Sequence, residues 1–287
     1  HLTAHVGSRG AEGLALIEVD LTDTAATEAA LREVDAHAVV SCLASRSGSR
    51  SDSERVEYGA NHNLLAWAVD HGVDHFTLLS AICVQKPRLA FQTQKLRFET
   101  ELAASGIDHS IVRPTAFFKS LSGQLDRVKA GKPFLVFGGG GLTRCKPIAE
   151  ADLARYLRLT LEVPALRGVL PIGGPGPALS PQNQAELLAG LLGRPVPMRS
   201  VPPALLSVAA RVFDVLGVVS KKAADKAEFA RIGHYYATES MLVWNDAHGT
   251  YSDEETPEFG TITLRDSYAA QLSGKETQDI GDHAMFT

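Results

Sequence analysis

The sequence is poor in cysteine. Its 287 residues include three, Cys42, Cys83 and Cys145, and no CxxC pair. This count and spacing argue against a disulfide framework and against a zinc site, and they are typical of a reducing compartment. Because an iron–sulfur cluster normally takes four thiolates, we expect any electrons to come from a dissociable carrier, most simply a pyridine nucleotide.

The sequence also has no excess of positive charge and no basic cluster. Lys and Arg number 28 against 33 Asp and Glu, which gives a formal net charge of -5. Such a balance offers no electrostatic footprint for a nucleic acid backbone. We therefore expect no nucleic acid partner.

No apolar run has membrane length. The nearest, residues 201–219, is interrupted by two prolines, a serine and two charged residues, and it predicts an amphipathic helix instead of a transmembrane segment. Its apolar stripe allows two interpretations, peripheral membrane contact or packing against the sheet domain, and we favour packing. The stripe consists of Leu205, Val208, Val212 and Leu216.

Apolar segments alternate with helical patterns over the first 172 residues. This alternation predicts a Rossmann-like, doubly wound parallel sheet covered by helices on both faces. The predicted strands are 14–19, 38–43, 75–79, 110–112 and 169–172. The predicted helices are 23–33, 56–71, 90–105 and 149–162.

The pattern changes in the second half of the chain. Segments 132–137 and 142–146 flank four glycines, Gly138 to Gly141, which favours a β-hairpin over a phosphate cradle. Proline-punctuated helices follow at 180–192, 204–216 and 221–232. We predict a nucleotide-binding domain over residues 1–172 and a smaller, mainly helical substrate lobe over residues 173–287.

One element of a dinucleotide fold is missing. Such folds place a glycine-rich turn between the first strand and the first helix, where backbone amides meet the pyrophosphate. Gly7-Ser8-Arg9-Gly10 is the nearest string, but it precedes a predicted strand and is interpreted as a loop. Together with a start at His1 instead of Met, this predicts that the first βα unit lies outside the sequence, along with any transit peptide. Residues 1–10 have neither the basic start nor the apolar region of a secretory signal, and we expect none.

Other parts of a nucleotide site are present. Asp20 and Leu21 follow the first predicted strand and could meet an adenine edge, although Asp20 could equally cap a helix. Ala44, Ser45 and Arg46 follow the next strand, and Arg46 could pair with a phosphate or remain solvated.

Three further residues carry a resemblance. Ser80, Phe91 and Lys95 look like the Ser, Tyr and Lys positions of short-chain dehydrogenases, with Phe91 in place of the tyrosine. Five phrases in order along the chain resemble the NADPH-dependent divinyl chlorophyllide 8-vinyl-reductase family, an atypical short-chain dehydrogenase group with NmrA-like relatives. They are VVSCLASR, LLSAICVQKP, IVRPTAFFKS, LPIGGPG and YYATESML.

The resemblance implies an activity, a cofactor and a location. The activity would be NADPH-dependent reduction of a vinyl group on a magnesium porphyrinoid in chlorophyll synthesis. The location would be the chloroplast stroma or thylakoid surface in a eukaryote, and the cytoplasm in a bacterium. Two alternatives stay open: an isoflavone-reductase-type enzyme acting on a smaller enone, and a non-catalytic NADP-binding regulator or assembly factor.

The resemblance also suggests roles for individual residues. Lys95 and Ser80 would be catalytic beside the nicotinamide, with the proton coming from Lys95, a water or a tyrosine. The cofactor would also contact Pro114, Thr115 and Phe117. The candidate substrate residues are Phe118, Lys119, Tyr235 and Tyr236.

Metal binding is not expected from the histidines. Asp70, His71, Asp74 and His75 join a predicted helix end to a strand start, which is a poor geometry for a metal site. His234 could ligate the substrate's magnesium, but a lone histidine is more often a surface residue.

Overall fold

The computed structural model describes residues 15–217 and 220–274, and its centre is a parallel sheet of four strands. The strand order is β1-β2-β3-β5, and His75 aligns with both Ala38 and Asp108 in the register. The strands are β1 (Ala38–Ser41), β2 (His75–Leu79), β3 (Asp108–Pro114) and β5 (Gly168–Ile172).

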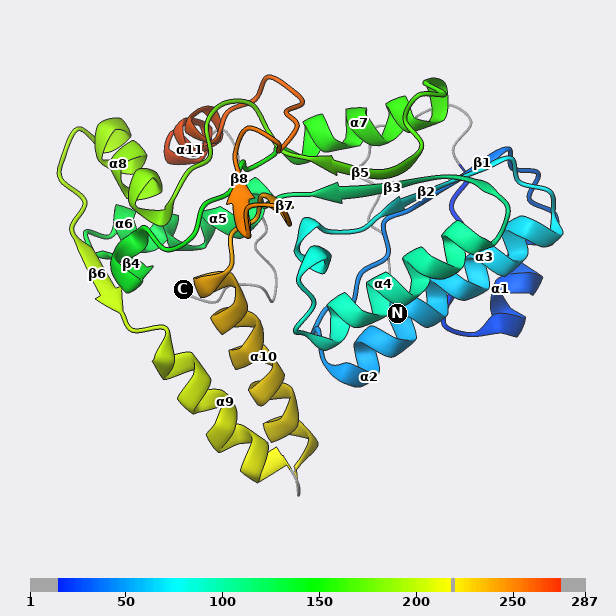
Figure 1. Cartoon of the computed structure of the whole chain (residues 1–287), viewed down its shortest axis with the longest axis horizontal. Helices are drawn as coiled ribbons and strands as arrows, with labels where there is room; N and C mark the ends of the chain where they lie inside the picture. Colours follow the sequence, from blue (N-terminus) through cyan, green and yellow to red (C-terminus); the bar gives the residue numbers. More distant parts are fainter. Residues whose placement is uncertain (1–14, 218–219, 275–287) are drawn as a thin grey trace.

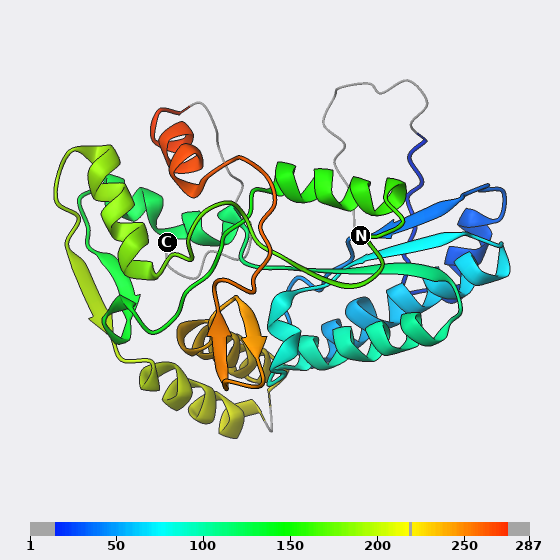
Figure 2. The same ribbon diagram turned by 45° about the horizontal axis from the view of Figure 1, so that its top comes forward.

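Helices cover both faces of this sheet (Figures 1 and 2). One face is covered by α3 (Asn61–Asp70) and α4 (Ala90–Ala104), and the other by α7 (Glu150–Glu162). α1 (Thr24–Leu31) packs against α3, and its N-cap is Asp23, whose side chain accepts a hydrogen bond from the Ala26 amide. Separate apolar cores lie on the two faces, one around Phe76 and Phe98 and the other around Val112 and Ile148. The predicted doubly wound sheet is therefore confirmed.

The helical run before β2 contains an uncommon element. α2 (Arg50–Ser53) is continued by a π-helical segment, η1 (Glu54–Ala60), and then by α3. The predicted helix at 56–71 is thus present but starts earlier. π segments are rare and are often found at functional sites, and this one carries the buried Glu57.

Beyond the C-terminal edge of the sheet, apart from the cores on its two faces, lies a separate apolar core, hereafter the second core. It joins Phe118, Val128 and Phe134 to Leu188 and Tyr268, so it includes residues on both sides of position 172. The division of the chain at residue 172 stays a prediction. The elements of this part are α5 (Phe118–Leu121), η3 (Ser122–Gln124), α6 (Leu125–Lys129), β4 (Phe134–Phe137), η4 (Gly138–Gly140), α8 (Pro181–Leu192), β6 (Met198–Val201) and α11 (Leu264–Leu272).

A helical hairpin and a β-hairpin complete the structure. α9 (Ala204–Gly217) and α10 (Lys221–Thr238) pack on each other and extend away from the second core (Figure 1). β7 (Val243–Asn245) and β8 (Thr250–Ser252) pair antiparallel beside η2 (Ile82–Gln85), which bonds to this hairpin through Gln85.

The strand predicted at 14–19 is wrong over its described residues. Residues 15–19 have no strand structure, and Leu16 is 68% exposed. A strand needs a neighbour for its backbone groups, and within the described residues the sheet offers this segment no pairing partner.

The predicted hairpin around the glycines is also wrong. Gly138, Gly139 and Gly140 all have positive φ angles and form the tight turn η4. β4 pairs instead with β6, in parallel. β6 lies far from β4 in the sequence, so the local pattern around the glycines could not predict this pairing.

The apolar stripe of α9 does not pack against the sheet domain, contrary to the favoured interpretation. Leu205, Val208, Val212 and Leu216 are each at least half exposed, because α9 contacts α10 through its other side. No helix in the described part of the chain combines the length and hydropathy needed to cross a membrane.

Asp152 anchors the segment before α11 to α7. Its fully buried carboxylate accepts hydrogen bonds from the amides of Thr261 and Ile262, both at 3.0 Å, and also pairs with Arg155. Burial acts to raise the pKa of Asp152, but the Ile262 amide and the Arg155 guanidinium outweigh it and hold the pKa below 3.8.

We expect Asp152→Asn to lower the free energy of unfolding by about 1–3 kcal/mol, because an amide NH₂ would face backbone donors. Urea denaturation at pH 7 measures this loss, with the exposed Asp35→Asn as control. Since the folded-state pKa is depressed, the wild-type advantage should be present above pH 3.8 and shrink as the pH falls below it. An unchanged unfolding curve at pH 7 would contradict this role.

Candidate functional site

The candidate site lies at the carboxyl ends of the parallel strands, where open α/β sheets bind ligands. Ser45 follows β1, Ser80 follows β2 and Thr115 follows β3. The sheet register brings the ends of these three strands together on one edge.

Lys95 is held at this edge by a buried carboxylate. Its ammonium lies 2.7 Å from Glu57 Oε2, and the two side chains are 10% and 3% exposed. The other oxygen, Glu57 Oε1, accepts hydrogen bonds from the Ser45 amide at 2.9 Å and the Ser45 hydroxyl at 3.0 Å. One carboxylate therefore joins the loop after β1 to the middle of α4.

Ser80 belongs to a second network. Its hydroxyl donates to Glu99 Oε1 at 2.5 Å, and Glu99 also accepts from the guanidinium of Arg113. Glu99 follows Lys95 by four residues on α4, and residues so spaced share one helix face. The structure thus brings Ser80 and Lys95 to the same side of α4, each held by its own glutamate.

The aromatic residues near Lys95 differ in accessibility. Phe91, one helical turn before Lys95, is partly buried against the core around Cys83 and Tyr235. The Tyr235 hydroxyl donates its hydrogen bonds to the carbonyls of Cys83 and Lys86, at 2.8 and 3.1 Å. Tyr235 is only 3% exposed, so its predicted contact with substrate is not supported by its position.

Tyr236 is placed differently. Its side chain is 39% exposed, and its hydroxyl lies 3.9 Å from the Cys83 sulfur. Burial of the hydroxyl, reinforced by the neighbouring Cys83, holds the pKa of Tyr236 well above its usual value. The hydroxyl of Tyr236 is thus buried while part of its side chain is exposed.

The predicted cofactor residues near β1 lie in loops. The Leu21 carbonyl accepts a hydrogen bond from Asn63 of α3. Asp20 accepts hydrogen bonds from Thr22 and does not cap α1, whose N-cap is Asp23. Ala44 and Arg46 are exposed beside the partly buried Ser45. The cofactor contacts of Asp20, Leu21, Ala44, Ser45 and Arg46 stay predictions. The interpretation of Gly7 to Gly10 as a loop also stays a prediction, because these residues lie outside the described part of the chain.

The residues after β3 are mostly engaged in structure. The Thr115 hydroxyl donates to the Lys146 carbonyl, and its amide donates to Ile172. Phe118 is 2% exposed inside the second core, so a pigment has no surface there to contact, and the predicted contact is not supported. Pro114 is buried, whereas Phe117 and Lys119 are partly exposed and stay candidates.

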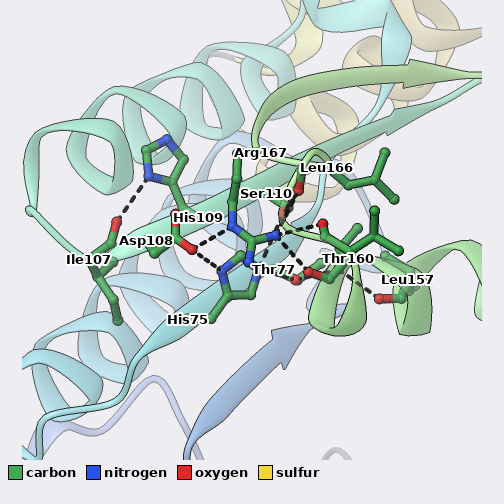
Figure 3. Close-up of polar contacts among 11 residues, drawn as sticks. His75, Thr77, Ile107, Asp108, His109, Ser110, Leu157, Thr160, Leu166 and Arg167 are labelled. Atoms are coloured by element: carbon green, nitrogen blue, oxygen red, sulfur yellow. Dashed lines mark hydrogen bonds and ion pairs between the residues drawn. The ribbon is translucent and has the colours of Figure 1, made fainter.

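A Ser-His-Asp arrangement occurs at the opposite edge of the sheet (Figure 3). Ser110 Oγ lies 3.2 Å from His75 Nε2, and His75 Nδ1 lies 3.4 Å from Asp108 Oδ2. Ser110 is fully buried, however, and its hydroxyl donates to the Leu166 carbonyl at 2.5 Å. Burial also lowers the pKa of His75. The cluster, which Arg167 ties to Asp108 and α7, is structural because no substrate can reach the serine.

The described residues contain no group of three or more His, Cys, Asp or Glu that could hold a metal ion. His234 is partly buried on α10, and its carbonyl accepts a bond from Thr238. The prediction that it could meet a substrate metal stays untested.

Glu57 belongs to the site although no sequence motif includes it. It lies on the buried side of the helical run, together with Val56, Ala60 and Asn61. A glutamate on an otherwise inward-facing side is the signal that could have found it, because a buried carboxylate needs a partner.

Comparison with known proteins identifies the family. A family model described as NAD(P)H-binding matches residues 3–162, more than half of the chain. Divinyl chlorophyllide a 8-vinyl-reductase, chloroplastic, from Cucumis sativus is 47% identical over 88% of this chain. Its counterpart from Oryza sativa subsp. indica is 47% identical over 93%. The chain belongs to the divinyl chlorophyllide a 8-vinyl-reductase family.

The chain spans 62% of the cucumber protein and 68% of the rice protein. Solved structures with 18% identity or less support the fold alone. An Escherichia coli NADPH-dependent quinone oxidoreductase, solved with NADPH, matches 91% of this chain and 84% of its own with a TM-score of 0.63. The Bordetella bronchiseptica enzyme WbmG, solved with NAD and UDP, matches 92% and 80% with a TM-score of 0.65.

The buried Glu57–Lys95 pair can be tested by a double-mutant cycle. Removing one partner leaves the other charge buried and unpaired, so Glu57→Gln or Lys95→Met alone should each cost about 3–5 kcal/mol. The double variant should cost less than the sum of the two single variants, by about 0.5–3 kcal/mol. Urea unfolding of all four proteins measures this coupling, and additive losses would rule it out.

Proposed function

We propose that this protein reduces the 8-vinyl group of a divinyl chlorophyllide or protochlorophyllide to an ethyl group with NADPH. The observation that carries the proposal is the buried Lys95 at the carboxyl edge of the sheet, in a chain 47% identical to the plant reductases. The chloroplastic relatives support action in the chloroplast, where a peripheral contact with a pigment-bearing membrane would give access to substrate.

The residues present fit a nicotinamide cofactor. Lys95 has three N–H donors, and within residues 15–217 and 220–274 its ion-pair partner is Glu57. Up to two donors are thus available for the ribose hydroxyls. Ser45, Ser80 and the loop after β3 line the same edge, and Leu21 and Arg46 lie in loops that would flank the adenosine half.

The proposed reduction relies on alignment more than on a strong acid. NADPH would supply a hydride to the vinyl group. After hydride addition the negative charge would spread over the conjugated macrocycle, whereas in a ketone it falls on one oxygen that must be protonated. A reaction of this kind would therefore not need the tyrosine that a carbonyl reductase has at the position of Phe91. Lys95 would orient the cofactor, and its positive charge would stabilise an electron-rich transition state.

Tyr236 is the better of the two candidate tyrosines for the proton. The Tyr235 hydroxyl donates to two backbone carbonyls, whereas the Tyr236 hydroxyl donates to Cys83 Sγ, which is a weak acceptor. The Tyr236 phenol is protonated at neutral pH, as a proton donor must be, although its burial raises the pKa and makes it a weaker acid. Its ring would also give the pigment an aromatic surface.

The activity test uses divinyl chlorophyllide and NADPH deuterated at the transferred position. Reduction adds one hydride and one proton, so the product should be heavier by about 3 Da and contain one deuterium. No turnover would favour the non-catalytic regulator. Faster reduction of a small enone in direct competition would favour the isoflavone-reductase type.

The role of Lys95 is best tested without leaving Glu57 as a buried, unpaired charge. The neutral pair Glu57→Gln/Lys95→Met should lower kcat at least about 100-fold, because it removes the ammonium beside the reacting centre. Circular dichroism checks that the variant is folded. Unchanged kcat in the folded double variant would remove Lys95 from the mechanism.

The two tyrosines make a matched comparison. Tyr236→Phe should reduce kcat by about 10-fold or more through loss of the proton donor, with little change in KM for NADPH. Tyr235→Phe should mainly reduce stability, since it removes only hydrogen bonds to backbone carbonyls. Equal kcat for wild type and Tyr236→Phe would assign the proton to water or Lys95.

A further inference from the structure

α9 has two apolar faces, and one of them is uncovered. Phe213 and the buried Ala210 lie on the side toward α10, where the Lys226 ammonium stands 5.7 Å from the Phe213 ring. The uncovered side carries five aliphatic side chains that are between 50% and 74% exposed. These are Leu205, Val208, Val212, Val215 and Leu216, hereafter the α9 stripe.

The α9 stripe is continuous along the helix. At 3.6 residues per turn its five members fall within an arc of about 100°, the width of a face that normally meets an apolar partner. In Figure 1 α9 lies on the outer side of the helical hairpin, away from the parallel sheet. The described residues therefore leave this face open to a partner outside the fold.

The charges around the stripe are basic. Residues 198–231 contain six Lys or Arg and three Asp or Glu, whereas acids outnumber bases in the whole chain. Arg199, Arg211 and Lys226 are exposed. Asp214, the acid within α9, is neutralised by two bonds from Arg231, at 2.7 and 2.9 Å. An aliphatic stripe with a positive surround is complementary to an anionic lipid surface.

We propose that the α9 stripe is a membrane-docking surface, which inserts its aliphatic side chains among anionic lipids while the flanking basic residues contact headgroups. A second copy of the chain fits less well. The stripe belongs to a single 14-residue helix about 21 Å long, whereas a stable dimer buries about 800 Å² per partner. A lipid surface sets no such minimum area for a single helix.

The test uses the full chain and vesicles of phosphatidylcholine alone or with one third phosphatidylglycerol. Wild type should sediment with the anionic vesicles. Leu205→Ser/Val212→Ser/Leu216→Ser should bind at least about 10-fold more weakly. Arg211→Glu/Lys226→Glu should also weaken binding, by about fivefold per residue. Leu142→Ser and Val169→Ser, exposed aliphatic residues elsewhere, are the controls and should bind like wild type.

Insertion is measured directly with a fluorescent reporter. Leu205→Trp should be quenched by brominated lipid chains, while Val69→Trp on α3 should not. Equal vesicle binding by wild type and the triple serine variant would overturn the proposal. So would absence of binding to anionic vesicles, or a dimer in light scattering that the triple variant abolishes. None of these readouts depends on reductase turnover, so failure here leaves the proposed activity standing.

Discussion

The candidate site depends on one buried carboxylate. Glu57 contacts Lys95 on α4 with one oxygen and Ser45 after β1 with the other. Charges buried to this degree are tolerated only when they are paired and hydrogen-bonded. The contact therefore fixes three elements relative to one another, the loop after β1, the π-helical segment and α4, and it sets the Lys95 ammonium at the ligand-binding edge of the sheet.

A second buried glutamate separates the roles of Ser80 and Lys95. Glu99 engages the Ser80 hydroxyl and the Arg113 guanidinium, one helical turn beyond Lys95. In a dehydrogenase that protonates an oxygen, serine and tyrosine hydroxyls would have to face that oxygen. Here the serine is occupied and a phenylalanine replaces the tyrosine. Both features agree with a reaction on a carbon–carbon double bond, for which orientation and a nearby positive charge suffice.

Much of the fold was predictable because its signals are local. The apolar run His75–Leu79 became β2 without change, and the helical pattern at 90–105 became α4. The helix predicted at 180–192 became α8, with Ser180 as its N-cap. The pairing of β4 with β6 and the exposure of the α9 stripe were not predictable, since both depend on which distant segments fold alongside.

The site was predictable only in outline. Strand ends predicted one edge for Ser45 and Ser80, because parallel strands share a direction. The prediction for Lys95 rested on the resemblance to short-chain dehydrogenases. The partners of these residues were not predictable. Glu57 and Glu99 contact them through packing between separate elements, and Phe118 and Tyr235 are buried by neighbours far along the chain.

The most direct test is a crystal structure of this protein with NADPH bound. We predict that Lys95 Nζ hydrogen-bonds a hydroxyl of the nicotinamide ribose at about 3 Å, with Glu57 still on its other side. A nicotinamide ring seated at another edge of the sheet, with Lys95 joined to Glu57 alone, would contradict it.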